Sequence, residues 1–370
     1  MKENKNAKRI LYCIHINWGW IKQRPQFLAE GLNIHFQIDV LSRWTWHKEA
    51  NTNETAINML FPFRLPFERF KIISWLNSFF RHRYLRSIIN NYDYIWFTAP
   101  SNDSAYLLSI IDNNIKVIYD CMDDLLEFPN SIQKSNTLFE AEKKLFDRSN
   151  LIICSSNYLK GKLLKRYGTK KIVVVNNALA MNCTMKETDV LPPNTSSFLK
   201  TPNIRIVYIG TISEWFDVEL CRNIVKVFRN VEFFLFGPCN SEMYSKFDFS
   251  GINICGSVDH KYVNSIMAHS DILIMPFVIT ELVQSVNPVK LYEYIKSGKP
   301  CIAPRYGESE SFGDYVYLYN DANECINIVS SLISGKNGAK MPKEECVKYA
   351  EQNTWEKRID VIKKEIIDLS

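Results

Sequence analysis

Short apolar runs recur along the whole chain, and each is separated from the next by a segment long enough for a helix. Strands that alternate with helices predict a parallel sheet, because parallel neighbours need a crossover connection. The fold class expected is therefore α/β, with doubly wound parallel sheets. The predicted strands are residues 10–16, 38–41, 94–98, 117–120, 151–156, 171–175, 204–210, 231–237, 252–256, 272–277, 301–304 and 315–319.

The chain divides into two halves at a change of composition. Residues 182–203 are rich in Pro, Thr, Ser and Asn, which predicts a linker. A length of 370 residues suits two domains, and 46% hydrophobic residues suffice for substantial cores. We predict one domain over residues 1–181, a second over 204–341, and an amphipathic C-terminal helix within 342–370.

The composition argues against several classes of protein. A net charge of +5 is too small to indicate a nucleic-acid partner, and ten cysteines without a CxxC pair fit a reducing cytosol. No run approaches the ~18 apolar residues of a membrane-spanning helix, and no signal peptide is recognisable. No GxGxxG follows a predicted strand, which argues against a nicotinamide oxidoreductase. We expect a cytoplasmic protein, soluble or peripheral at the inner face of the plasma membrane.

Residues 272–304 contain the most informative local pattern. They predict a buried strand, a polar loop over 278–287, a helix that begins at Pro288, and a further strand. Proline suits the first turn of a helix because its missing N–H has no partner there. Gly298 suits the helix end, which favours left-handed dihedral angles.

The start of this helix predicts the kind of ligand. Unpaired backbone N–H groups at Ser285, Val286 and Asn287, with Lys290 in the first turn, suit a diphosphate. Glu293 lies three residues further along the same face, within reach of a sugar hydroxyl. Phosphate beside a polyhydroxyl ring predicts a nucleotide or a nucleotide-sugar.

The loop after the first strand, HINWGW, carries further candidates. Asn17, Gly19 and Arg24 lie near the carboxyl end of a parallel strand, where ligands bind in such sheets. We predict that they line a ligand-binding cleft. The alternative for Arg24 is a salt bridge at the start of the helix that follows.

The run VIYDCMDD ends a strand with three carboxylates, those of Asp120, Asp123 and Asp124. Carboxylates at this place take part in acid–base chemistry or hydrogen-bond a sugar. They also cap helices, which is the commoner use of Asp before a helix. The residues alone leave both uses open, and we expect Asp123 or Asp124 to be the most exposed of the three.

Basic and aromatic residues alternate over residues 61–90, with Glu68 as the lone acid. This composition suits a helix that lies on an anionic bilayer, where each cation contributes ~1 kcal/mol. A helix packed inward with a solvated basic face explains the pattern equally well.

The run NPVKLYEYIKSGKPCIA resembles the donor-binding helix of bacterial glycosyltransferases with the GT-B architecture, close to glycosyltransferase family 4. The runs DRSNLIICSSNYLK and GTISEWFDVEL resemble other elements of the same family, so the resemblance covers nearly the whole chain. It implies two Rossmann-like domains facing a cleft, an acceptor-side first domain and a nucleotide-sugar-binding second domain. On this resemblance Asn17, Gly19 and Arg24 lie on the acceptor side of the cleft. The resemblance also favours a site role for Asp123 and Asp124. It also implies that the last helix packs back toward the first domain.

The resemblance assigns roles to the donor side. Glu293 corresponds to the ribose ligand of the family, Gly210 and Thr211 to backbone near the donor phosphate, and Val258 and Tyr262 to neighbours of the base.

Two departures from the family pattern concern the donor. The acid that touches the donor sugar in the family falls eight positions before Glu293, where this chain has Ser285. No Arg or Lys follows the Gly210 turn until Arg222, so Lys290 carries most of the cationic contact.

The predicted function is transfer of a sugar, we expect from a UDP-sugar, to a lipid-linked or polysaccharide acceptor in cell-surface glycan biosynthesis. The residues predicted to be catalytic are Asp123, Asp124 and Lys290. GT-B transferases generally need no metal, so we expect none here, and no cofactor besides the nucleotide-sugar. The alternatives are a nucleotide-sugar epimerase of the same fold and a non-catalytic nucleotide-sugar-binding module.

Overall fold

The structure is a computed structural model, and it forms two compact units. Unit 1 comprises Met1–Asn177 with Trp355–Ser370, and unit 2 comprises Ala178–Thr354. Each unit is described by itself. The described residues are 7–19, 22–42, 57–127, 135–180, 191–192, 195–239 and 241–369.

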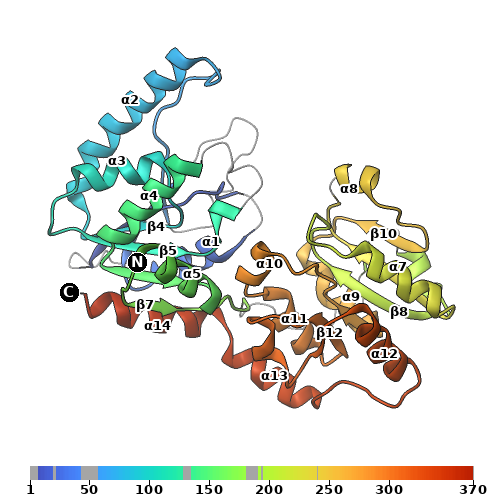
Figure 1. The fold of residues 1–370 in the computed structure, drawn as a ribbon. Helices are drawn as coiled ribbons and strands as arrows, with labels where there is room; N and C mark the ends of the chain where they lie inside the picture. The colour runs from blue at the N-terminus through green and yellow to red at the C-terminus, as the bar shows by residue number, and fades with distance from the viewer. Residues whose placement is uncertain are drawn as a thin grey trace. The chain divides into compact units, whose positions relative to one another are not determined.

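A seven-stranded sheet in the order β3-β2-β1-β4-β5-β6-β7 forms the centre of unit 1 (Figure 1). All of its neighbouring strands pair in parallel, and Leu11 lies opposite both Asp39 and Ile95. Helices cover both faces, which explains why β4 and β6 are buried throughout. The strands are β1 Arg9–Cys13, β2 Gln37–Leu41, β3 Asn58–Leu60, β4 Tyr94–Phe97, β5 Lys116–Cys121, β6 Leu151–Cys154 and β7 Ile172–Val174.

The helices of unit 1 begin at local signals in the sequence. Ser101 caps its helix through a reciprocal pair with Ser104, and Ser156 accepts from the Leu159 N–H, as expected for a cap before Asn157. The helices are α1 Arg24–Leu32, α2 Lys71–Ile88, α3 Asn102–Ile110, α4 Ser135–Arg148, α5 Asn157–Tyr167 and α14 Trp355–Ile367, with short 3-10 turns η2 Ile89–Asn91 and η3 Leu125–Glu127.

Unit 2 contains a six-stranded sheet in the order β10-β9-β8-β11-β12-β13, again parallel throughout. Its strands are β8 Ile204–Ile209, β9 Val231–Phe236, β10 Ile252–Gly256, β11 Ile272–Ile274, β12 Cys301–Pro304 and β13 Tyr317–Tyr319. Its helices are α6 Ser196–Lys200, α7 Val218–Val227, α8 Ser241–Lys246, α9 Val263–His269, α10 Glu281–Ser285, α11 Val289–Ser297, α12 Ala322–Ile333 and α13 Lys343–Gln352, with η5 His260–Tyr262 and η6 Ser309–Phe312.

Both sheets place their first strand next to their fourth, with the second and third on the other side. This is the doubly wound Rossmann arrangement, in which the order of the strands along the sheet reverses between the first and fourth strands. The predicted fold class, two Rossmann-like parallel-sheet domains, is therefore confirmed. Ligands of such sheets bind at the carboxyl ends of the strands beside the switch point.

The structure departs from the prediction at β3 and at the end of the predicted linker. β3 was not predicted, since its three residues are too short to stand out. Much of the predicted linker, residues 182–190 and 193–194, lies outside the described residues. Its end forms α6, in which Phe198 is fully buried against Phe234, so this part belongs to the core of unit 2.

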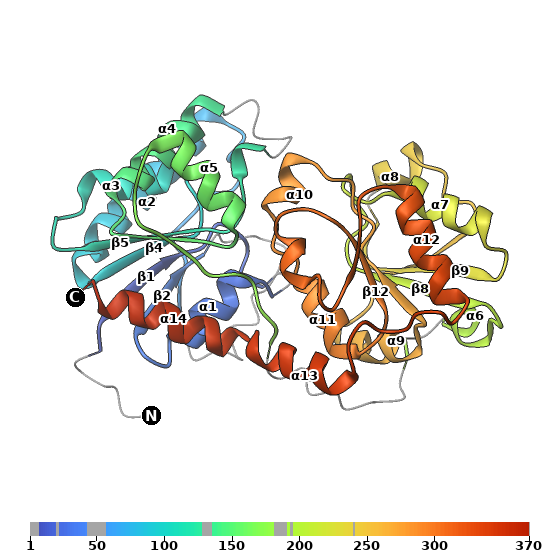
Figure 2. The same cartoon turned by 60° about the horizontal axis from the view of Figure 1, so that its bottom comes forward.

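The predicted single C-terminal helix is two helices. α13 packs on α11 within unit 2, whereas α14 packs on α1 within unit 1 (Figure 2). Trp355, the first residue of α14, is buried and stacks on Phe27 at 5.3 Å between ring centroids. Gly31 of α1 has no room for a side chain because Ile359 occupies that space. Among the helices of the described residues, none has the length and apolar character to cross a membrane.

Candidate functional site

The central helix of the candidate site is α11, and its bounds confirm the local prediction. Pro288 is the N-cap, Val289 is the first helical residue, and Gly298 ends the helix with a left-handed φ of 73°. Lys290 is therefore the second residue of the helix, in the first turn, where unpaired backbone N–H groups and the macrodipole attract anions.

The start of α11 lies beside the end of β8. The Tyr294 hydroxyl accepts from the Ile209 N–H at 2.9 Å, which fixes the helix against the strand. The next residue, Gly210, has a φ of 149°, and a methyl group there would lie 2.7 Å from Lys290 Nζ. Glycine is thus required at this position, both for its backbone conformation and to leave room for the ammonium group.

Lys290 is a half-buried cation above aromatic rings. Its Nζ lies 5.4 Å from the Tyr208 ring centroid and 5.5 Å from that of Phe277. Burial lowers the pKa of Lys290, and the charge of Glu293 partly offsets this effect. Among the described residues, no carboxylate forms an ion pair with Lys290. A bound anion would stabilise the charged form of this side chain.

The prediction of a polar loop over residues 278–287 is partly wrong, because this segment contains the short helix α10. Thr280 caps this helix, and the N–H of Val286 donates to the Val283 carbonyl at 3.1 Å. The Val286 N–H predicted to be unpaired is thus occupied. Ser285 is fully buried and donates to the Leu282 carbonyl at 2.6 Å.

Asn287, the last residue before the α11 cap, is also buried. Its side-chain oxygen accepts from the Tyr292 hydroxyl at 3.3 Å, so this amide holds the turn against α11. These contacts give Ser285 and Asn287 structural roles in shaping the entry to the helix. Their contact with a donor stays a prediction.

Glu293 meets a partner that the sequence analysis missed. His260 Nε2 lies 3.4 Å from Glu293 Oε1, and this hydrogen bond raises the pKa of His260. No local signal in the sequence pairs two residues 33 positions apart. Val258 and Tyr262, on either side of His260, are half-buried and pack against the core of unit 2, while Thr211 is exposed.

In unit 1, Arg24 forms a buried ion pair with Asp120. Arg24 Nε and Nη2 lie 3.0 and 2.8 Å from Asp120 Oδ1, and Nη1 donates to the Val175 carbonyl at 2.7 Å. Both side chains are almost completely buried. This is the alternative predicted for Arg24, a salt bridge at the start of the helix. It leaves almost none of the guanidinium exposed for contact with an acceptor.

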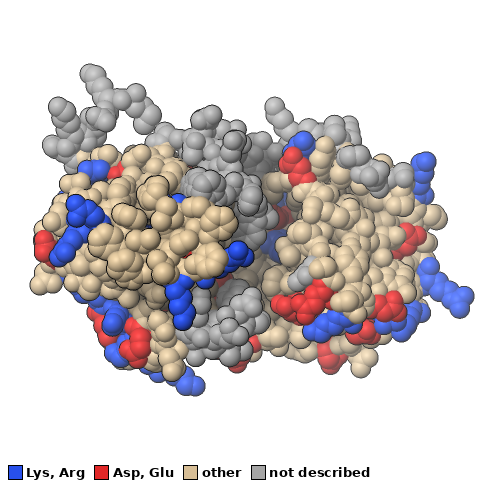
Figure 3. All heavy atoms as spheres, turned by 90° about the horizontal axis from the view of Figure 1, so that it is seen from above, with Lys and Arg blue, Asp and Glu red and all other residues tan. Residues whose placement is uncertain are grey.

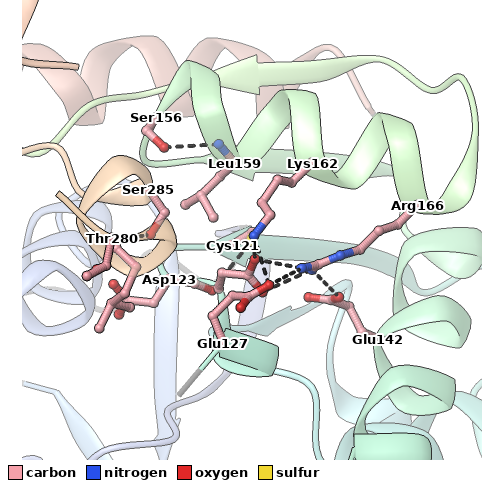
Figure 4. Close-up of polar contacts among 12 residues, drawn as sticks. Cys121, Asp123, Glu127, Glu142, Ser156, Leu159, Lys162, Arg166, Thr280 and Ser285 are labelled. Atoms are coloured by element: carbon pink, nitrogen blue, oxygen red, sulfur yellow. Dashed lines mark hydrogen bonds and ion pairs between the residues drawn. The ribbon is translucent and has the colours of Figure 1, made fainter. Parts of the chain in front are cut away.

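Asp124 is also held by cations (Figure 4). Lys162 Nζ lies 2.9 Å and Arg166 Nη2 2.6 Å from Asp124 Oδ2. Burial by itself raises the pKa of Asp124, but the hydrogen bonds from Arg166 and Lys162 outweigh it and the net pKa is lowered. Asp124 is 1% exposed, so of the two residues predicted to be the most exposed of the three carboxylates it is Asp123 that fits.

Asp123 differs from both neighbours. It is half-buried, and its carboxylate has no hydrogen-bond or ion-pair partner among the described residues. Burial raises the pKa of Asp123 to about 6, against the opposing charge of Arg24. A carboxyl group that titrates near neutral pH is suited to accept and release a proton.

The remaining first-loop candidates form a tight turn. The Asn17 side-chain oxygen accepts from the Gly19 N–H at 3.1 Å, and Gly19 is exposed. This turn shapes the loop after β1, and its contact with an acceptor stays a prediction.

The segment 61–90 contains α2, which turns only part of its surface inward. Asn77 and Leu85 are its buried residues, whereas Ile72, Trp75 and Phe79 are 75%, 64% and 51% exposed. The inward-packing alternative thus leaves the aromatic side chains unexplained. Figure 3 shows the molecule from above, where Lys and Arg side chains and Asp and Glu side chains both border broad areas of other residues.

A family model described as glycosyl transferases group 1 matches residues 203–335, which form most of unit 2. Together with the two Rossmann-like sheets, this match to unit 2 indicates a glycosyltransferase with the GT-B architecture. Among the described residues, no group of three or more His, Cys, Asp or Glu side chains is placed to hold a metal ion.

The chain is similar to TuaH of Bacillus subtilis (strain 168), a protein assigned to teichuronic acid biosynthesis as a glycosyltransferase. The two are 27% identical over 278 residues, which cover 70% of this chain and 68% of TuaH. Among solved structures it resembles sucrose-phosphate synthase from Thermosynechococcus elongatus, with a TM-score of 0.74, 12% identity, and coverage of 98% and 99% of the two chains.

Anabaena HepE in complex with UDP also has this fold, with a TM-score of 0.69, 12% identity, and coverage of 98% and 100%. HepE has been solved with UDP-glucose as well.

Proposed function

We propose that the protein transfers a sugar from a UDP-sugar to a lipid-linked or polysaccharide acceptor in cell-surface glycan synthesis. The observation that carries the donor side is the unpaired ammonium of Lys290 at the start of α11, beside Gly210. The UDP and UDP-glucose complexes of HepE support the choice of nucleotide, and the similarity to TuaH supports the surface-glycan role.

In the proposed reaction the bond between the anomeric carbon and the diphosphate oxygen breaks. A bond from that carbon to the acceptor oxygen forms, and the acceptor hydroxyl loses its proton. Lys290 and the N-terminal end of α11 stabilise the negative charge that develops on the departing UDP. In other enzymes a metal ion has this role. Of the three carboxylates at the end of β5, Asp123 is the one without an ion pair among the described residues, and we assign it the proton.

Thermal unfolding with UDP, GDP and ADP tests the donor assignment. A nucleotide that binds the folded chain alone raises the melting temperature, by an amount that grows with its concentration over its Kd. We expect UDP to give the largest shift and Lys290→Ala to abolish it. Lys296→Ala, in the last turn of the same helix, is the matched control and should keep the shift.

Turnover separates the proposal from its alternatives. Wild-type protein incubated with labelled UDP-sugars and membrane extract should transfer label to a glycan, or hydrolyse the donor slowly without acceptor. Formation of an epimer of the donor sugar, or UDP binding with no turnover, would contradict transfer.

We further propose that α2 rests on the anionic inner face of the plasma membrane. Exposed apolar and basic side chains alternate on it and on the segment before it, an arrangement suited to the bilayer interface. The exposed cations are Arg69, Lys71, Arg83 and Arg86, and the exposed apolar residues are Phe61, Phe63, Phe67, Phe70, Ile72, Trp75, Phe79 and Phe80.

A further inference from the structure

Unit 1 contains a cavity of about 680 Å³ at the carboxyl ends of β1, β2 and β4. Cys13, Leu41 and Phe97, the last residues of these strands, line its floor, and side chains of α2, α3 and α4 line its walls. The cavity thus lies at the switch point of the first sheet, where doubly wound folds bind their ligands. Its volume falls within the ~300–1,000 Å³ of small-molecule sites.

The lining is rich in small hydrogen-bonding side chains. Two guanidinium–carboxylate pairs add planar donors and acceptors: Arg64 with Glu68, and Arg81 with Asp103 at 3.0 Å. The hydroxyl and amide side chains of the lining are Ser42, Ser74, Asn77, Ser78, Ser101, Asn102, Ser104 and Thr137. This combination offers many donors and acceptors with little net charge.

Three buried polar atoms of the lining lack a hydrogen-bond partner among the described residues. They are the hydroxyl oxygen of Ser42, a residue 5% exposed, Nε of Arg81, and Oδ1 of Asp103, which meets Arg81 in an ion pair. A buried polar group without a hydrogen bond destabilises the fold, so a ligand that supplies the missing bond is strongly favoured.

We propose that this cavity binds a polyhydroxyl sugar unit of the acceptor, with Ser42 and Arg81 as specificity-determining contacts. This inference rests on the proposed transferase function and replaces Arg24 as the polar anchor of the acceptor side. A nucleoside diphosphate fits poorly, since each arginine already faces a carboxylate. An acyl chain fits poorly as well, since it would leave the buried Ser42 hydroxyl unpaired.

Saturation-transfer NMR on the full chain tests the proposal. The probes are the methyl glycosides of glucose, galactose, N-acetylglucosamine and glucuronic acid, with sodium decanoate as an apolar competitor. At least one glycoside should bind, and Ser42→Ala should weaken it about five-fold, the effect of one lost hydrogen bond. The same substitution should leave the melting temperature unchanged or raised, because it removes an unpaired buried hydroxyl.

Ser78→Phe, which places a ring in the cavity, should abolish glycoside binding. Ser109→Ala is the matched control, since this exposed serine of α3 lies outside the lining and donates to the Tyr106 carbonyl. UDP-induced stabilisation, measured on every variant, reports on the donor site and on correct folding.

Each outcome decides one of the two proposals. Weaker glycoside binding in Ser42→Ala and none in Ser78→Phe, with the UDP response intact, supports the cavity as the sugar site. No glycoside binding, equal binding in both variants, or saturation by decanoate alone overturns it while leaving the transferase function in place. Absence of a UDP response in the wild-type protein counts against the donor assignment itself.

Discussion

Asp123 and Asp124 show at the residue scale how partners decide the chemistry of a side chain. Both follow β5, but Asp124 meets Lys162 and Arg166 while Asp123 meets no cation at hydrogen-bond distance. The sequence groups the two acids correctly. It cannot separate them, because the partners of Asp124 come from a helix about forty residues further along the chain.

The first prediction concerns the pH dependence of transfer. The base form of Asp123 is lost below its raised pKa of about 6, so kcat/KM should fall about tenfold per pH unit below that value. Asp123→Asn should lower the rate by about 10²–10⁴-fold and remove this acidic limb. Initial rates from pH 4.5 to 8 measure both effects, and UDP binding by the variant is the control. An unchanged pH profile in Asp123→Asn would remove the residue from the mechanism.

Asp124 is predicted to act on stability. Its lowered pKa means that its contribution is present above the pKa of the unfolded chain and is lost as the pH falls through the folded-state value. Asp124→Asn should destabilise unit 1 by roughly 3 kcal/mol at pH 7, because it leaves two cations without their carboxylate. Urea unfolding measures the difference.

The matched control is Asp147→Asn, which breaks the exposed pair of Asp147 with Lys143 on α4. Exposed pairs of this kind contribute about 0.5 kcal/mol or less. Equal effects of the two substitutions would show that the Asp124 cluster does not stabilise the fold.

At the scale of elements, prediction succeeds where the signal is local. Pro288 and Gly298 fix both ends of α11 through their own backbone preferences, and the sequence alone places Lys290 in the first turn. The His260–Glu293 contact depends on packing between distant segments. The helix α10 has a local cap in Thr280, but its five residues are too few for a helical period to show in the sequence. The cavity of unit 1 depends on three strand ends that no sequence spacing brings together.

The second helix carries a prediction about membranes. Trp75→Ser with Phe79→Ser should reduce binding to vesicles containing phosphatidylglycerol on the order of tenfold, because two exposed rings no longer enter the interface. Co-sedimentation measures the partition. Tyr244→Ser removes an exposed ring from α8 of unit 2 and should change nothing. Equal partition of all three proteins would contradict docking through α2.

At the scale of the whole molecule, the chain forms the same kind of parallel sheet in both units, and its last helix belongs to the first unit. After unit 2 ends at Thr354, α14 returns to unit 1 and packs on α1 (Figure 2). The Rossmann pattern predicts both sheets from their apolar runs. It does not reveal that α13 (343–352) belongs to unit 2 and α14 (355–367) to unit 1, because both segments read as amphipathic helices.

This connection predicts that the two units respond separately to a change in α14. Trp355→Ala removes a buried ring stacked on Phe27, and such substitutions cost about 3–5 kcal/mol. Hydrogen exchange should therefore accelerate in the strands of unit 1. Amides near Lys290 should keep their protection by UDP, since the donor residues named here all belong to unit 2. Val361→Ala, on the exposed side of α14, should leave both units unchanged, and equal acceleration in the two sheets would show that α14 stabilises them as one body.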